Sequence, residues 1–139
     1  MGYLNDLAIQ IYDSASEKGW HDKPVAFGDC ITNIHAELSE AWEEYRHGKA
    51  LNKTYYTCKL DGTNEDSECT DDVHECYFRT GDEDICEKAK PEGIPSELAD
   101  VIIRVLDACH MYEIDIDKII AEKMDYNKTR SYKHGGKII

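Results

Sequence analysis

Four carboxylates, two on each of two stretches of the chain, are the residues whose spacing best suits chemistry. Glu37 and Glu40 are three positions apart, and Glu97 and Asp100 have the same separation. On a helix, that spacing places both side chains of a pair on one face. Mg²⁺ and Mn²⁺ prefer oxygen ligands, so two packed helices carrying these pairs would form a divalent-cation site. Either pair alone is also common on a solvated helix surface, so the prediction depends on both pairs meeting.

The spacing of apolar residues predicts the helices that must position these carboxylates. Helices are expected over residues 3–18, from about residue 26 to the Arg46–Lys49 segment, from about Pro95 to His110, and after Asp115. The second helix carries the apolar stripe Ile31, Ile34, Leu38, Ala41, Trp42 and Tyr45. The third carries Leu98, Val101, Ile102, Val105, Leu106 and Cys109, and the last carries Ile116, Ile119, Ile120 and Met124. We expect these stripes to pack and the carboxylates to flank them, facing a cleft.

Residues 52–93 have a different character and are expected to be an insertion between the two carboxylate-bearing helices. They contain twelve acidic and five basic residues, a net charge of −7, with no sustained helical period. Cysteines 58, 69, 76 and 86 lie in this stretch, and with His74 they could bind Zn²⁺. Their spacings lack the Cys-x-x-Cys pairs typical of zinc sites, so we expect free thiols ahead of zinc or disulfides.

Length, charge and hydropathy exclude several classes of function. The 139 residues predict one domain, and the formal net charge of −13 argues against binding nucleic acid or an anionic membrane. No run approaches the roughly 20 apolar residues of a membrane-spanning helix, and none resembles a signal peptide, so a cytoplasmic protein is expected. The short helices with wide apolar arcs predict an all-α bundle that is completed by oligomerisation, as a homodimer or homotetramer.

Three segments resemble the MazG-like all-α nucleoside triphosphate pyrophosphohydrolases: Phe27 to Arg46, Pro91 to Asp107, and Lys123 to Lys137. That family carries Glu-Glu-x-x-Glu on one helix and Glu-x-x-Asp on the next. The chain departs from the family at two points. Ala36 replaces the first Glu of the first motif, and the stretch between the motifs is much longer than is usual for the family.

The resemblance implies a MazG-like helical fold and a set of site residues. Glu37, Glu40, Glu97 and Asp100 would bind Mg²⁺, with Mn²⁺ as a substitute, while water attacks the α-phosphorus of a nucleoside triphosphate. The products would be the monophosphate and pyrophosphate, and Glu40 is the preferred proton acceptor. Three residues of the last helix, Lys123, Asn127 and Arg130, would hold phosphates, with Lys133 or Lys137 as further candidates. Trp20 and Asn33 are candidates for contacting the base, whereas Trp42 is expected in the core.

Three other interpretations fit the same residues. The architecture could instead hydrolyse a nucleoside diphosphate or phosphoribosyl-ATP. A non-catalytic helical module that binds a partner through its cysteine-rich insertion is the alternative from another class. The sequence leaves open the preferred base and sugar, the number of metal ions, and the fold of residues 52–93.

Overall fold

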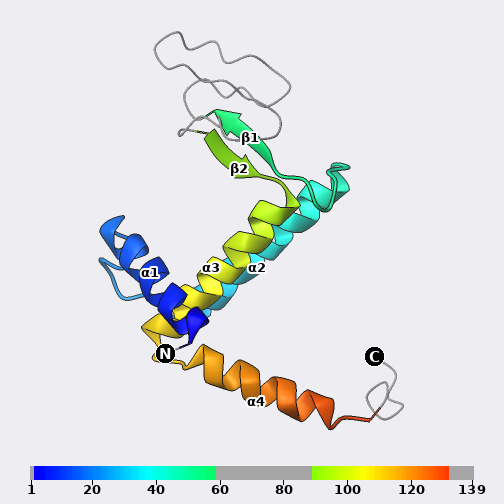
Figure 1. Ribbon diagram of the computed structural model, residues 1–139. Coiled ribbons are helices and arrows are strands. Elements are labelled where there is room, and N and C mark those ends of the chain that lie inside the picture. The colour runs from blue at the N-terminus through cyan, green and yellow to red at the C-terminus, as the bar shows by residue number, and fades with distance from the viewer. Residues whose placement is uncertain (1, 59–88, 132–139) are drawn as a thin grey trace. The chain divides into compact units, whose positions relative to one another are not determined.

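The computed structural model describes residues 2–58 and 89–131, and this part of the chain is mostly helical (Figure 1). Its elements, in order, are α1 (Tyr3–Glu17), α2 (Phe27–Arg46), β1 (Tyr55–Cys58), β2 (Ala89–Glu92), α3 (Ile94–Met111) and α4 (Ile116–Lys128). The four predicted helices are thus confirmed, with bounds close to those expected. The predictions for Cys69, His74, Cys76, Cys86, Lys133 and Lys137 lie outside the described residues, and the side chain of Cys58 is not described.

The chain groups into two compact units. The first consists of Met1–Ile31 with Ile103–Ile139, and the second is Thr32–Ile102. The first therefore holds α1 and α4, and the second holds most of α2, the two strands and the start of α3. No helix in residues 2–58 and 89–131 is long and apolar enough to cross a membrane.

In the first unit, α1 and α4 are joined end to end by side chains that cap each other's N-termini. Asp117 accepts hydrogen bonds from the backbone N–H groups of Leu4 and Asn5, at 3.3 and 2.7 Å. In return, the Asn5 side chain accepts from the N–H of Ile116 at 3.1 Å and donates to Asp115 at 2.8 Å. A β-carbon on Gly2 would collide with the Asp117 carboxylate, so a larger residue there would have to displace this capping side chain. These bonds satisfy N–H groups that helix starts leave unpaired.

In the second unit, two strands follow α2 and precede α3 in the chain, and they pair antiparallel to each other. Tyr55 pairs with Glu92 and Cys58 with Ala89, so residues more than thirty positions apart become neighbours. Gly93, with φ of +99°, turns the chain from β2 into α3, and a β-carbon there would lie 2.9 Å from the backbone oxygen of Lys53. Only glycine fits this junction without displacing the backbone. The sequence reasoning placed an insertion here but did not predict the strands.

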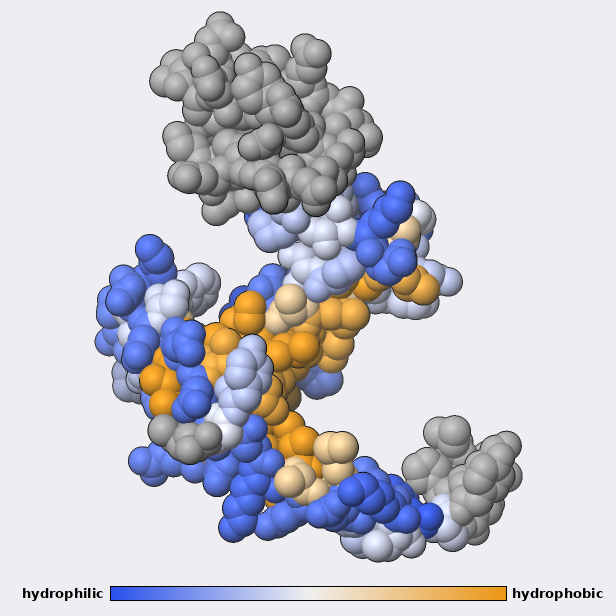
Figure 2. Space-filling view, in the orientation of Figure 1, coloured by the Kyte–Doolittle hydropathy of each residue, from blue (hydrophilic) through white to orange (hydrophobic). Residues whose placement is uncertain are grey.

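The apolar stripes pack differently from the expectation. On α2, Leu38, Trp42 and Tyr45 are 44, 59 and 51% exposed, whereas Glu37 is only 7% exposed. On α3, Leu98 is exposed and Glu97 is buried. Figure 2 shows hydrophobic side chains gathered on the surface along these helices. In the single chain these stripe residues are therefore exposed, whereas Glu37 and Glu97 on the flanks are buried. The packing of the stripes in an oligomer stays a prediction.

On α4, too, the predicted core positions are not buried. Ile119, Ile120 and Met124 are exposed, and no residue of this helix is buried. The first unit buries mainly small and sulfur-containing side chains, namely Ala8, Cys30, Ala108 and Cys109, together with Leu106. Burial raises the pKa of the thiols of Cys30 and Cys109, so both are expected to stay protonated and unreactive at neutral pH.

Candidate metal centre

Three of the four predicted metal ligands come together in the second unit. One carboxylate oxygen from each of Glu37, Glu40 and Glu97 lies within 4.8 Å of the other two. Glu37 and Glu40 lie one turn apart on α2, and Glu97 lies in the first turn of α3. The i, i+3 spacing on α2 thus contributes two oxygens, and the packing of α3 beside it contributes the third.

The burial of these carboxylates is uneven. Glu37 and Glu97 are 7 and 8% exposed, and Glu40 is exposed. Besides these two glutamates, the buried side chains of this unit include only Ala41 and Ile94 within the described residues. A buried carboxylate is costly unless hydrogen bonds or a cation compensate its charge. Two buried carboxylates beside a third concentrate negative charge in this unit, and a bound divalent cation would neutralise part of it.

The electrostatics at Glu97 follow from this arrangement. Burial raises its pKa above the ordinary value, and the negative charges of Glu40, Asp100 and Glu37 raise it further. The ammonium group of Lys90 acts in the opposite direction. Glu97 consequently holds a proton more tightly than a solvated glutamate, and a divalent cation would compete with protons for this carboxylate.

Asp100, the fourth predicted ligand, stands apart from the group of three. It lies three residues after Glu97 on α3, is half-buried, and its charge acts on Glu97. Its oxygens are not among the carboxylate oxygens of Glu37, Glu40 and Glu97 that lie within 4.8 Å of one another. Its assignment as a ligand stays a prediction.

The predicted phosphate-binding residues lie in the other unit. Lys123, Asn127 and Arg130 lie on α4 or just after it, all three exposed, with the Lys123 ammonium 5.8 Å from the centre of the Tyr126 ring. Trp20 is also in the first unit and is 67% exposed. Asn33 is in the second unit, exposed and one turn before Glu37. Their assignments to phosphate and base stay predictions.

Next to the carboxylates lies a group of residues on the strands that sequence reasoning missed. The Tyr55 hydroxyl donates to Glu44 Oε1 at 3.0 Å, which ties β1 to α2. Glu92 on β2 accepts from the Thr57 hydroxyl at 3.1 Å and pairs with the Lys90 ammonium at 3.2 Å. The Tyr-Tyr-Thr run favours a strand. Its partner contains Pro91, which gives no such signal, so nothing local revealed the pairing.

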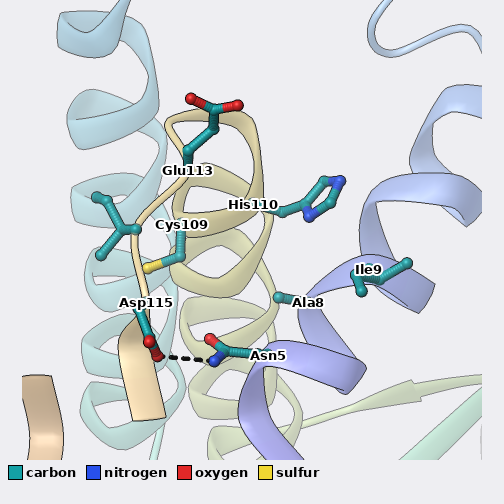
Figure 3. A pocket seen from close by; sticks show the side chains of 8 residues that line it. Asn5, Ala8, Ile9, Cys109, His110, Glu113 and Asp115 are labelled. Atoms are coloured by element: carbon teal, nitrogen blue, oxygen red, sulfur yellow. Dashed lines mark hydrogen bonds between the residues drawn. The ribbon is translucent and has the colours of Figure 1, made fainter. Parts of the chain in front are cut away.

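A separate pocket of about 320 Å³ lies in the first unit (Figure 3). Its wall includes Asn5, Ala8, Ile9, Cys109, His110, Glu113, Ile114 and Asp115. The Asn5 amide and the Asp115 carboxylate are already engaged with each other and with the start of α4. None of the residues predicted to bind metal, phosphate or base lines this pocket. It is therefore separate from the candidate centre.

Comparisons of the chain with family models, with curated proteins and with solved structures found no match. Evidence for a function therefore comes from the three carboxylates and the residues around them.

Proposed function

We propose that the protein is a Mg²⁺-dependent nucleoside triphosphate pyrophosphohydrolase, which converts a nucleoside triphosphate to the monophosphate and pyrophosphate. The observation that supports this most is the meeting of Glu37, Glu40 and Glu97 within 4.8 Å, with two of the three buried. The donor set is entirely carboxylate oxygen, which suits Mg²⁺ or Mn²⁺ and does not suit a soft metal. The MazG-like resemblance of the two acidic motifs is the second support.

Each residue has a distinct role in this proposal. Glu37, Glu40, Glu97 and Asp100 would hold Mg²⁺, which when bound neutralises charge on the phosphates and makes a water more acidic. Glu40 is the exposed member of the group, so a water and a substrate could reach it. We assign it a second role, as acceptor of the proton that the attacking water loses. Lys123, Asn127 and Arg130 would hold phosphate oxygens, as the resemblance implies.

Self-association forms part of the proposal. Leu38, Trp42, Tyr45 and Leu98 are each more than 40% exposed on α2 and α3. Large apolar side chains concentrated on two neighbouring helices are typical of a protein interface. A homodimer or homotetramer would remove this surface from water.

The test is product analysis with a panel of nucleoside triphosphates and diphosphates and phosphoribosyl-ATP, in Mg²⁺. Pyrophosphate release from a triphosphate is expected, and Glu40→Gln and Asp100→Asn should each lower kcat by at least about 100-fold. The matched control is Glu43→Gln, because Glu43 is exposed and pairs with Arg46 on the same helix. Orthophosphate from a diphosphate would support the alternative hydrolase, and no product from any substrate would support a binding module. Full activity of both carboxylate variants would remove these residues from the mechanism.

A further inference from the structure

The paired strands hold a lysine beside the carboxylate group. Strand β2 leads directly into α3 through Gly93, and the N–H of Glu97 donates to the Gly93 oxygen at 3.1 Å. Lys90 therefore lies on the segment that starts the helix carrying Glu97. The Tyr55 hydroxyl bond to Glu44 ties the opposite strand to α2, the helix that carries Glu37 and Glu40. Both strands are thus fixed to the helices that form the candidate centre.

The Lys90 ammonium is anchored through Glu92, and both oxygens of Glu92 are used. One accepts from the Thr57 hydroxyl at 3.1 Å and the other pairs with the Lys90 Nζ at 3.2 Å. The ion pair with Glu92 raises the pKa of Lys90, and the charges of Glu97 and Glu40 raise it further. Lys90 is therefore positively charged. The Tyr55–Glu44 hydrogen bond attaches its strand pair to α2 one helical turn from Glu40. Its side chain is still 55% exposed, so the ammonium can contact a ligand.

We propose that Lys90 binds a phosphate oxygen of the polyphosphate that the centre takes, with Glu92 and Thr57 as positioning residues. The proposal rests on the proposed function, because the carboxylates attract a polyphosphate only with a divalent cation in place. Carboxylates alone would repel phosphate, and a positive charge at their edge would supply a direct attraction. This would assign the strands at the base of the insertion a role in the site.

The test compares Lys90→Met with wild-type protein, using Lys53→Met as the matched control. Methionine keeps a long side chain and removes the charge, and Lys53 is an exposed lysine of the same unit. Binding of inorganic tripolyphosphate with Mg²⁺, measured by calorimetry, is expected to weaken about tenfold in Lys90→Met. For the best triphosphate substrate, KM should rise by a similar factor with little change in kcat. Lys53→Met should match wild type in both measurements.

Binding of Mn²⁺ alone, measured by electron paramagnetic resonance, separates phosphate contact from a structural role. Removing a positive charge near a cation site cannot weaken the attraction for the cation, so Lys90→Met should bind Mn²⁺ at least as tightly as wild type. Parallel weakening of Mn²⁺ and tripolyphosphate would show that Lys90 only holds the carboxylates in place, and would overturn the proposal. Unchanged tripolyphosphate binding in an active protein would overturn it as well. A wild-type protein that neither binds tripolyphosphate nor releases pyrophosphate would instead refute the proposed function, and this proposal with it.

Discussion

Replacing Glu97 with glutamine should change the stability of the protein in opposite directions with and without a divalent cation. Glu97 is 8% exposed, and oxygens of Glu37 and Glu40 lie within 4.8 Å of its own. Two unit charges at 4.8 Å repel by about 3.5 kcal/mol at an effective dielectric constant of about 20, and by about 0.9 kcal/mol in bulk water. Because Glu40 is exposed, we expect a value between these limits. Glu97→Gln should therefore stabilise the metal-free protein by about 1–2 kcal/mol, which raises Tm by about 3–8 °C.

The effect should reverse when the cation is present. A ligand that binds only the folded state at 1,000 times its Kd adds about 4.1 kcal/mol of stability, which exceeds the 1–2 kcal/mol gained by removing the repulsion. Wild-type protein should gain this from Mn²⁺, and Glu97→Gln should gain little because one ligand oxygen becomes a neutral amide. The assay is thermal unfolding at pH 8, in EDTA and in Mn²⁺. The control variant is Glu43→Gln, which removes an exposed charge on the same unit and should respond to Mn²⁺ as wild type does.

One outcome would refute the reasoning. If Glu97→Gln lowers Tm in EDTA and still gains the full Mn²⁺ stabilisation, the carboxylate is needed for local packing and is not part of a repelling ligand set.

Two further predictions follow from the charges and the caps. The pKa of Glu97 is raised, so in the pH window just above the ordinary glutamate value of 4.5 the folded, metal-free protein binds more protons than the unfolded chain. Its stability should therefore fall as pH rises through that window, whereas its affinity for Mn²⁺ should rise. Urea titrations in EDTA measure the stability, and Mn²⁺ binding at several pH values measures the affinity. A Glu97→Gln variant should lack the part of each pH dependence that Glu97 causes. Asp117→Ala should lower the free energy of unfolding by about 1–2 kcal/mol in urea titrations, because it removes the cap of α1. The control Asp125→Ala loses only an exposed ion pair with Lys128 and should lower it by about 0.5 kcal/mol or less. Equal losses would contradict the capping role.

The helices and the pairing of the carboxylates could be predicted because both depend on local spacing. Apolar residues three and four apart indicated all four helices, and the i, i+3 separation of Glu37 and Glu40 placed their oxygens together. Helical periodicity shows which residues share a face but not which side of that face meets a neighbouring helix. Periodicity therefore did not predict that Glu37 would be buried and Leu38 exposed in the single chain.

The strands could not be predicted because their evidence is non-local. Tyr55 and Glu92 pair across 37 positions of the chain, and the register is visible only once α2 and α3 are placed. Lys90 belongs to no recognisable sequence motif. Its position depends on the ion pair with Glu92 and on the turn at Gly93. The caps between α1 and α4 are equally non-local, because Asn5 and Asp117 meet only in the folded unit.

The charge balance of the candidate centre restricts how its four carboxylates can be used. Glu37, Glu40, Glu97 and Asp100 carry −4 when ionised, and the Lys90–Glu92 ion pair adds no net charge. One divalent cation would leave −2, which still repels a triphosphate, whereas two would give zero and remove the repulsion. If Glu40 instead takes up a proton as the reaction proceeds, one cation and one proton leave the sum at −1. Two Mn²⁺ ions bound per chain with tripolyphosphate would therefore assign all four carboxylates to metal, and one would leave Glu40 as the base.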